Sequence, residues 1–236
     1  MCAAFNFVRC VTLRQKGVLM GRCAVLADSS RVNPLECQAC DPRIARSKRA
    51  LRDALIGLME EQGFESVSVN DLCQRAGLNR GTFYNHFHTK EDMLAAMEEE
   101  VISDLERFRP QMQRLGIPEV MGYRLAKRPM PILVDFFEYM KEQGDFFHAV
   151  LGPGGDPSFG PRLRDLVCTD LIKSVLHEKY RNDPSVFVEY YVAFYASAYL
   201  GVIVRWIETG MNETPEEMAL IAMRLLFIKP GEHIEL

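Results

Sequence analysis

The stretch that decides the fold runs over residues 76–94 and reads AGLNRGTFYNHFHTKEDML. Gly77 stands where one helix is expected to end, and Asn79 is a residue type that caps the start of the next. Phe83 and Phe87 are four residues apart, so they share one face of that next helix. The spacing predicts a short helix, from residue 80 to about residue 87, that packs its aromatic side onto neighbouring helices.

The opposite side of this short helix carries small and hydrogen-bonding groups. At 100° per residue, the positions facing away from the two phenylalanines or lying on the flanks are Gly81, Thr82, Tyr84, Asn85 and His86. A helix with an apolar seam behind and polar groups in front can enter the major groove of DNA and contact base edges. The small Gly81 permits close approach of the backbone.

Further helices are predicted on both sides of this stretch. Asp41-Pro42 places an N-cap and a proline at a helix start, and Gly63 closes the helical period that follows. Ser68 and Asp71 have the spacing of a capping box for a second helix, and Thr89 caps a fourth. Three helices with a glycine turn between the second and the third form a helix-turn-helix unit.

The charge distribution restricts where nucleic acid can bind. The net charge is -4 and the isoelectric point about 5.8, so DNA binding requires a local basic surface. Residues 43–52, RIARSKRALR, carry five cations and no acid. This run opens the first helix, where Arg46 and Lys48 are candidates for phosphate contacts beside the groove. The alternative interpretation of such a run is a solvated helix face.

Residues 64–94, FESVSVNDLCQRAGLNRGTFYNHFHTKEDML, resemble the DNA-binding region of the tetracycline-repressor (TetR/AcrR) family of bacterial regulators. The resemblance extends over about residues 43–95. It rests on the Val67-x-Val69-x-Asp71-Leu72 entry, the Ala76-Gly77 turn, Thr82-Phe83-Tyr84-x-His86-Phe87 and Lys90-Glu91-x-x-Leu94.

The resemblance implies DNA contacts at individual positions. Family members bind DNA through the residues that correspond to Thr82, Tyr84, His86 and Lys90. Base or phosphate contacts recur at the positions of Asn70 and Arg80, and Asn85 stands where side chains tune the operator sequence. The predicted DNA-binding set comprises Arg46, Lys48, Ser68, Asn70, Arg80, Gly81, Thr82, Tyr84, Asn85, His86 and Lys90.

The second half of the chain is rich in aromatic residues. Fourteen of the 23 aromatic side chains lie between positions 130 and 210. We expect an apolar or aromatic effector to bind among residues that recur at helical steps, namely Phe136, Phe137, Met140, Phe147, Tyr191, Phe194 and Tyr195. The alternative is a solid core in which the rings pack against one another.

The sequence GDPSF at residues 155–159, followed late in the chain by Trp206, resembles the C-terminal region of a Firmicutes-type branch of the same family. This second resemblance extends over about residues 131–227.

Two helices are expected to join subunits. Asp183 and Pro184 predict the start of a long apolar helix that reaches Gly210, and Thr214 with Glu217 predicts a capping box for the last helix. A helix this apolar is either buried or paired with a copy of itself. The resemblance implies a four-helix bundle between two subunits, and such a homodimer has the two-fold symmetry that a palindromic operator requires.

The sequence contains none of the motifs that indicate catalysis or a cofactor. A phosphate loop, a nucleophile elbow, paired catalytic carboxylates and a dinucleotide fingerprint are missing from it, so we expect neither an enzyme nor a cofactor. Cys37-x-x-Cys40 has no second cysteine pair at metal-site spacing, and His86-x-His88 points in two directions on a helix. No metal site is predicted, although Asp145 and His148 leave a ligand-side metal contact open.

The expected location is the cytoplasm. Arg22 interrupts the nearest candidate signal segment, and the longest apolar uncharged run, Tyr190–Val204, is shorter than the ~20 residues of a membrane span. Seven cysteines, an odd number, agree with reduced thiols.

Together these patterns predict an all-α chain with a poorly ordered extension (1–40), a helix-turn-helix DNA-binding domain (41–107) and a C-terminal ligand-binding and dimerisation domain (108–236). We expect a homodimeric repressor whose unknown small-molecule effector shifts the fourth helix and so changes the separation of the two DNA-reading helices. The alternative function is a coactivator of the same fold that acts through protein–protein contacts.

Overall fold

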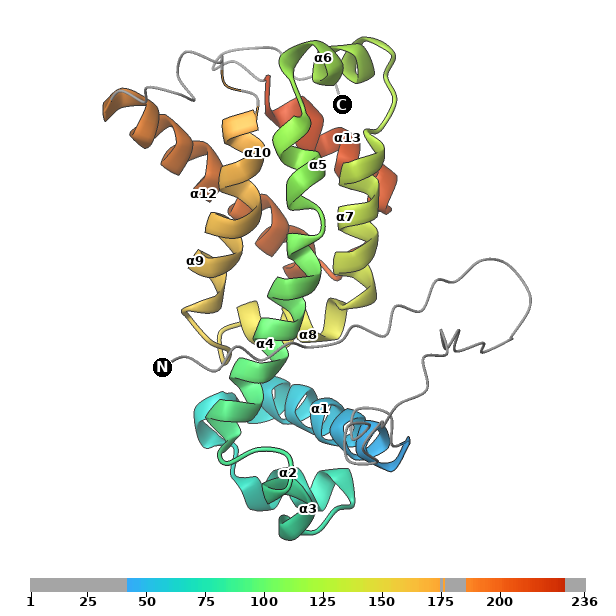
Figure 1. Ribbon diagram of the computed structural model, residues 1–236, viewed down its shortest axis with the longest axis vertical. Coiled ribbons are helices and arrows are strands. Elements are labelled where there is room, and N and C mark those ends of the chain that lie inside the picture. Colours follow the sequence, from blue (N-terminus) through green and yellow to red (C-terminus); the bar gives the residue numbers. More distant parts are fainter. Residues whose placement is uncertain (1–41, 175, 177–185, 228–236) are drawn as a thin grey trace, which may run out of the picture. The chain divides into compact units, whose positions relative to one another are not determined.

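The computed structural model describes residues 42–174, 176 and 186–227, and every regular element in these ranges is a helix (Figure 1). The all-α fold predicted from the sequence is confirmed. All of these helices belong to one compact unit that begins at Cys40. The predictions for residues 1–40, for Asp183 and Pro184, and for Cys37-x-x-Cys40 lie outside the described residues.

The first helices form the predicted helix-turn-helix unit. Their bounds are α1 (Pro42–Gln62), the 3-10 turn η2 (Phe64–Ser66), α2 (Val69–Ala76), α3 (Arg80–Tyr84) and α4 (Lys90–Glu106). The third helix was predicted to reach about residue 87, but in the structure it ends at Tyr84. The backbone N–H of Phe87 still donates to the carbonyl of Phe83 at 2.9 Å, so both rings keep the predicted side.

Local chemistry explains where these helices begin and end. Ser68 and Asp71 form a reciprocal capping box at the start of α2, which Gly77 ends with a left-handed φ of 65°. The side chains of Asn79 and Thr89 accept backbone N–H groups at the starts of α3 and α4. The predicted caps at Ser68, Gly77, Asn79 and Thr89 are therefore confirmed, whereas the predicted cap at Asp41 lies outside the described residues.

A continuous core holds the unit together. Phe83 is completely buried, and the ring of Phe87 packs beside it with centroids 6.0 Å apart. The other fully buried side chains around them come from α1, α2 and α4 and are Leu51, Leu55, Leu72 and Met93. The apolar side of α3 thus packs onto the neighbouring helices, which leaves its other side outward.

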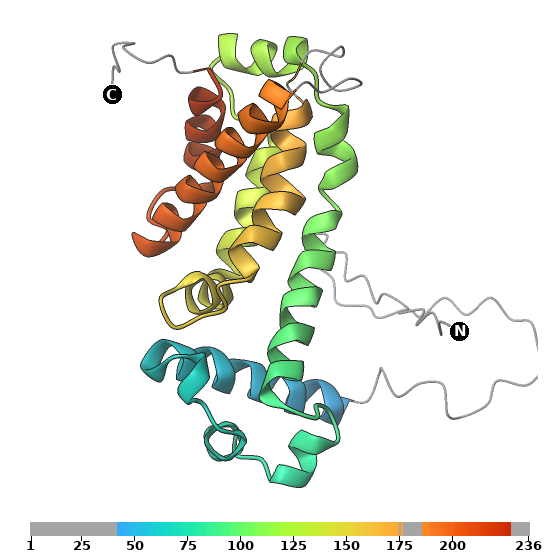
Figure 2. The same ribbon diagram turned by 90° about the vertical axis from the view of Figure 1, so that its left-hand side faces the viewer.

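The C-terminal half is a layered helical bundle (Figure 2). Its elements are α5 (Arg109–Arg114), α6 (Ile117–Leu125), α7 (Pro131–Glu142), α8 (Gly144–Leu151), α9 (Phe159–Leu163), the π-helical turn η3 (Arg164–Cys168), α10 (Thr169–Ser174), α12 (Val186–Glu208) and α13 (Pro215–Leu225). Helix α13 packs on α7, and α10 packs on both α5 and α12. The capping box at Thr214 was predicted and is confirmed, and α7 is divided from α8 near Gly144.

Helix α1 also packs directly against α8. The Arg52 guanidinium donates to Gln143 Oε1 at 2.6 Å and lies 5.2 Å from the centroid of the Phe146 ring. Glu60 and His148 add a carboxylate–imidazole contact of 3.0 Å. Polar side-chain contacts therefore join α1 directly to the C-terminal half.

Candidate nucleic-acid interface

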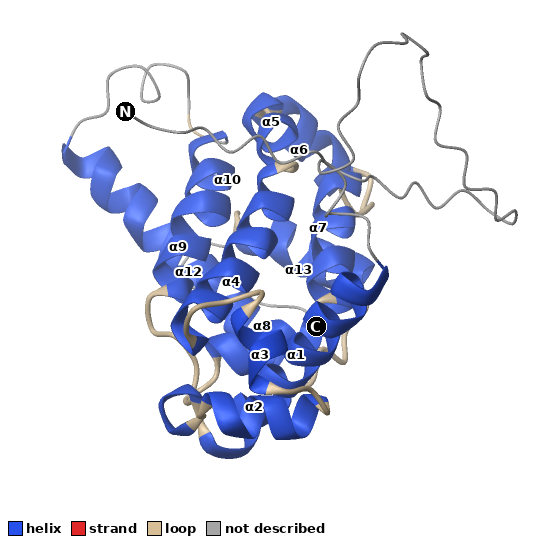
Figure 3. Cartoon of the chain, turned by 60° about the horizontal axis from the view of Figure 1, so that its bottom comes forward, coloured by secondary structure: helices blue, strands red, loops and turns tan. Residues whose placement is uncertain are grey.

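The short helix α3 presents its polar side to solvent. Helices α2 and α3 lie at the end of the unit opposite α6 (Figures 1 and 3). Gly81 and Asn85 are exposed, and Tyr84 leaves 53% of its surface accessible although its ring contacts Phe83 edge to face at 5.4 Å. Arg80 and Asn70 are also exposed beside them.

Six members of the predicted DNA-binding set have side chains without a hydrogen bond or ion pair within the described ranges. They come from α1, α2 and α3 and the residue after α3, and they are Arg46, Lys48, Asn70, Arg80, Tyr84 and Asn85. Three cations, an amide pair and a phenol are thus available for phosphate oxygens and base edges at no cost in internal contacts.

Two hydroxyls of the predicted set are already used. Ser68 Oγ donates to Asp71 Oδ2 at 2.6 Å, and Thr82 Oγ1 donates to Asn79 Oδ1 at 3.0 Å. A hydroxyl has one proton to donate and a phosphate oxygen only accepts. Each hydroxyl must therefore leave its capping partner before it donates to phosphate.

His86 lies against α1. Its Nε2 is 2.7 Å from Ser47 Oγ, and Ser47 Oγ donates its only proton to the carbonyl of Ile44 at 3.0 Å. The imidazole must therefore donate through Nε2–H. Burial, and then the charge of Lys48, lower the pKa of His86 below its ordinary value, which favours the neutral ring.

The ammonium of Lys90 is the most enclosed of the predicted cations. Its Nζ donates to the carbonyls of Phe64 and Glu65, each at 2.9 Å, and lies 4.7 Å from the centroid of the Phe64 ring. Only 15% of the side chain is accessible. In this structure Lys90 joins the start of α4 to the corner after α1. To contact a DNA phosphate, as predicted, the ammonium must either break its bonds to these carbonyls or donate its third N–H to the phosphate.

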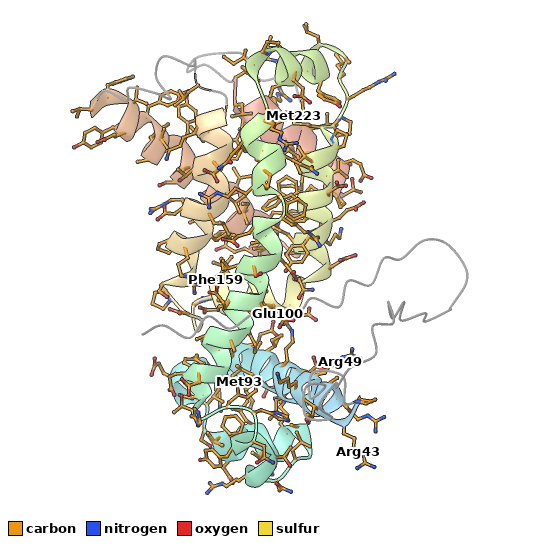
Figure 4. The ribbon with its side chains drawn as sticks, viewed as in Figure 1. Arg43, Arg49, Met93, Glu100, Phe159 and Met223 are labelled. Carbon is orange, nitrogen blue, oxygen red and sulfur yellow. The ribbon has the colours of Figure 1, made fainter. Side chains whose placement is uncertain are left out.

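Sequence reasoning missed several residues that build this surface. Ser47 holds His86, and the Arg75 guanidinium crosses Gly57 to reach Glu61 at 2.5 and 2.7 Å. No motif marks either contact, because each depends on how two helices cross. Arg49 projects from the N-terminal part of α1 (Figure 4), and the cationic run at residues 43–52 was the signal that could have included it.

The predicted effector-binding residues differ in burial within the described part of the chain. Phe136, Phe137, Met140 and Phe147 are buried, and Phe137 packs edge to face against Phe136 and Trp206 at 5.2 and 5.4 Å. Phe194, by contrast, is 69% exposed. The rings of Tyr191 and Tyr195 contact each other at a tilt of 40°, with centroids 4.5 Å apart. Edge-to-face packing of these rings is what the alternative of a solid aromatic core expects, and the effector site stays a prediction.

A polar cleft of about 450 Å³ opens between the C-terminal end of α4, α5 and α7. Phe108 and Tyr139 form its apolar part, over which the Arg107 guanidinium lies 4.7 and 4.8 Å from the two ring centroids. The remaining lining groups are Gln111, Asp135, Glu138 and Glu142. Only two of these seven lining residues, Phe108 and Tyr139, are aromatic, so the cleft is more polar than the predicted effector site.

The outer side of α12 is apolar and exposed. Its large accessible side chains are Val186, Phe187, Tyr190 and Phe194, and α13 adds Leu220 and Ile221. The opposite side of α12 packs on η3, α10 and α8. By length and composition α12 is the described helix that could cross a membrane, although the Tyr190–Val204 run alone predicted otherwise.

The fold and the exposed α3 surface define a helix-turn-helix regulator with a separate helical bundle behind it. Residues 46–97 match the profile of "Bacterial regulatory proteins, tetR family", and residues 127–227 match the profile of "Transcriptional regulator C-terminal region". The chain belongs to the TetR family of bacterial transcriptional regulators. Both resemblances drawn from the sequence are thereby confirmed.

Relatives agree with this assignment. The chain is 21% identical over 194 residues to the uncharacterized HTH-type transcriptional regulator YxbF of Bacillus subtilis, covering 80% of this chain and 47% of that protein. It is 29% identical over 86 residues to the HTH-type transcriptional repressor Rv1474c of Mycobacterium tuberculosis, covering 36% and 44%. The chain thus spans less than half the length of these relatives. A TetR transcriptional regulator from Streptococcus agalactiae shares the fold, with 19% identity, a TM-score of 0.50, and coverage of 78% of this chain and 95% of that one.

Proposed function

We propose that the protein binds double-stranded DNA and regulates transcription, with α3 in the major groove and α1 along the phosphate backbone. The observation that carries this proposal is a set of side chains that have no hydrogen bond or ion pair with any described residue, namely Asn70, Arg80, Tyr84 and Asn85 beside Arg46 and Lys48. Base-edge recognition needs donors and acceptors that are free to exchange water for bases. Phosphate contacts need cations that are not already neutralised.

A homodimer is the proposed working form. One copy presents one α3, whereas a palindromic operator needs two that are related by a two-fold axis. The exposed apolar side of α12, continued on α13 by Leu220 and Ile221, is a surface that a second copy would cover. The composition of α12 would also suit a membrane. If the purified chain forms a stable dimer in solution, no membrane is needed to cover this surface.

We propose repression as the sign of regulation and the cytoplasm as the location. One relative is named a transcriptional repressor, and an operator-bound dimer that blocks transcription requires no further partner. A small-molecule effector would act in the C-terminal half by shifting α4. The cleft lined by Arg107, Glu138 and Tyr139 adjoins the end of α4 and is the described space nearest to that role.

The coactivator alternative makes a different demand on the surface of α3. A protein that acts only through another regulator has no use for unpaired donors and cations beside an exposed α3. A gel-shift assay against the gene's own upstream DNA, with an unrelated fragment of equal length as the control, discriminates between the two functions. Retardation of the upstream fragment alone supports the regulator, and equal or no retardation of both fragments contradicts it.

A further inference from the structure

The glycine-rich loop at residues 152–158 lies between the helix-turn-helix unit and the C-terminal half. The backbone N–H of Phe64 donates to the carbonyl of Gly154 at 2.8 Å. A Cβ atom on Gly154 would stand 2.7 Å from the Cα of Gly63, so only glycine allows this approach. The same loop carries Asp156, whose carboxylate accepts the N–H and hydroxyl of Ser158 at 2.8 Å each.

Glu98 of α4 faces this loop from the core. It is only 2% exposed, and its Oε2 accepts one Arg162 N–H at 3.0 Å. The second N–H of Arg162 goes to Glu99 Oε2, also at 3.0 Å. Glu98 Oε1 is buried and has no donor within the described residues. A buried carboxylate oxygen without a donor is costly and calls for a partner.

The carboxyl of Asp156 is the charged group that acts most strongly on Glu98, and the mutual effect of the two carboxyls on their pKa values puts them within reach of a shared proton. Two carboxylates are both acceptors, so they can be joined only if one of them carries a proton. Asp156 already accepts from Ser158 twice, which favours its charged form. The proton therefore belongs to Glu98, whose protonated Oε1 then donates to Asp156.

We propose that Glu98 and Asp156 form a proton-dependent latch, which holds the loop at residues 152–158 against α4 and the Gly63–Phe64 corner and releases it when the proton is lost. After loss of the proton two negative carboxylates face each other, Glu98 buried and Asp156 partly buried, with Arg162 as the cation that acts on both. Repulsion between them acts directly on the loop, because Asp156 is part of it.

The electrostatics set the pH range. Burial, followed by the charge of Asp156, raises the pKa of Glu98 to about 7, and Arg162 opposes this shift. Burial would raise the pKa of Asp156, but hydrogen bonds from Ser158 and Glu98 and the charge of Arg162 lower it. Since the pKa of Glu98 is raised on folding, the stabilisation from its proton is complete below its ordinary value of 4.5 and is lost as the pH rises through about 7. The contribution of Asp156 has the opposite sign and is lost only in stronger acid.

Other charges around the latch are paired among themselves. Arg164 and Asp165, which follow Arg162 in sequence, form an ion pair at 2.8 Å. On the side of α1, Arg52 lies 3.9 Å from Glu100 of α4. His148 and Glu60 also join the two halves, at 3.0 Å, and this contact is an ion pair only when His148 is protonated. An experiment must therefore separate Glu98 from His148.

Hydrogen–deuterium exchange of the full-length protein provides the test, because it needs neither operator nor effector. The readout is the protection of peptides covering Phe64 and residues 150–158 between pH 5 and 8, corrected for intrinsic exchange. In the wild type the opening equilibrium should rise by about tenfold per pH unit between pH 5 and 7 and then level off. Glu98→Gln, whose amide donates to Asp156 as the protonated acid does, should stay closed with no such rise.

Three further variants make the result decisive. Glu99→Gln removes the exposed acceptor of Arg162, and His148→Gln removes the neighbouring imidazole; both should keep the wild-type pH dependence. Asp156→Asn should shift the rise of the opening equilibrium to lower pH, since Glu98 then has no anion beside it. This variant decides the outcome if Glu98→Gln fails to fold. The latch would be overturned by any of three results. Exchange in the wild type could be independent of pH, or its pH dependence could be unchanged in the variant of Glu98 or Asp156 that folds. The third result is that His148→Gln abolishes the pH dependence.

A pH effect on DNA affinity would follow only if the proposed function holds. Binding of a retarded upstream fragment at pH 6 and 8, by wild type and by Glu98→Gln, measures that effect separately. A protein that binds no DNA but shows the exchange pattern would contradict the proposed function and leave the latch in place. A protein that binds DNA but lacks the exchange pattern would contradict the latch and leave the proposed function in place.

Discussion

Lys90 Nζ donates to the carbonyl oxygen of Phe64 at 2.9 Å and at the same time lies 4.7 Å from the centroid of the Phe64 ring. One ammonium therefore closes the gap between the start of α4 and the corner that follows α1. The family resemblance implied a DNA contact for this lysine, because the motif fixes its position at a helix start but says nothing about nearby carbonyls.

Lys90→Ala should consequently lower the stability of the helix-turn-helix unit. The loss of two charge-assisted hydrogen bonds should cost about 1–3 kcal/mol of unfolding free energy. Arg46→Ala removes an exposed cation that has no ion pair among the described residues, so it should leave the melting temperature nearly unchanged and flatten the salt dependence of DNA binding by about one unit of slope per contact. Denaturant titrations and binding at several salt concentrations measure both effects. If Lys90→Ala melts like the wild type and flattens the salt slope instead, the ammonium contacts phosphate after all.

Phe83 and Asn85 should separate folding from recognition. Phe83 is completely buried, so Phe83→Ala should destabilise the protein by roughly 3–5 kcal/mol. Asn85 is exposed, and Asn85→Ala should leave thermal melting unchanged while costing about 1–3 kcal/mol of DNA binding at one operator position. Equal melting losses for the two variants would mean that the two sides of α3 are wrongly assigned.

His86 should titrate below the ordinary histidine pKa of 6.5, because burial and Lys48 disfavour the imidazolium. For a base whose pKa is lowered on folding, stabilisation is present above pH 6.5 and is lost as the pH falls through the folded value. Imidazole NMR should show the Nε2–H tautomer at neutral pH, since Ser47 must accept. Ser47→Ala should abolish that preference, and a wild-type ring protonated on Nδ1 at neutral pH would contradict the assignment.

The exposed side of α12 should hold the dimer together. Phe194→Ser removes a side chain that is 69% exposed in one copy and occurs twice in a symmetric interface. Its dimer dissociation constant should rise at least about tenfold, which corresponds to roughly 1.4 kcal/mol. Leu125→Ser, an equally exposed apolar change on α6, serves as the matched control and should have no effect. Analytical ultracentrifugation measures both, and an unchanged Phe194→Ser dimer would place the interface elsewhere.

The difference between what was and was not predictable follows the range of the forces involved. The caps at Ser68, Asn79 and Thr214 were readable because each is decided within four residues. The burial of Phe83 followed from helical period in the same way. The contacts of Lys90 with Phe64 and of His86 with Ser47 span 26 and 39 residues, and only the packing of helices brings those groups together.

The same reasoning explains the effector-site prediction. Aromatic residues at helical steps indicated that faces of two helices converge, and Phe137 does meet Trp206 of α12. Periodicity cannot tell a filled core from a cavity, however, because both require the same apolar side chains. Phe194 was included by its step along α12, although it lies on the outward side of that helix.

In vitro selection from random duplex DNA tests the central claim most directly. If two copies present α3 to successive major grooves, wild-type protein should enrich a palindrome whose half-sites lie about one helical turn, or a multiple of it, apart. The Asn85→Ala protein should enrich a palindrome of the same spacing that has lost its preference at one symmetric pair of positions. Enrichment of no sequence by the wild type, or of the same sequence by both proteins, would contradict DNA reading by this surface.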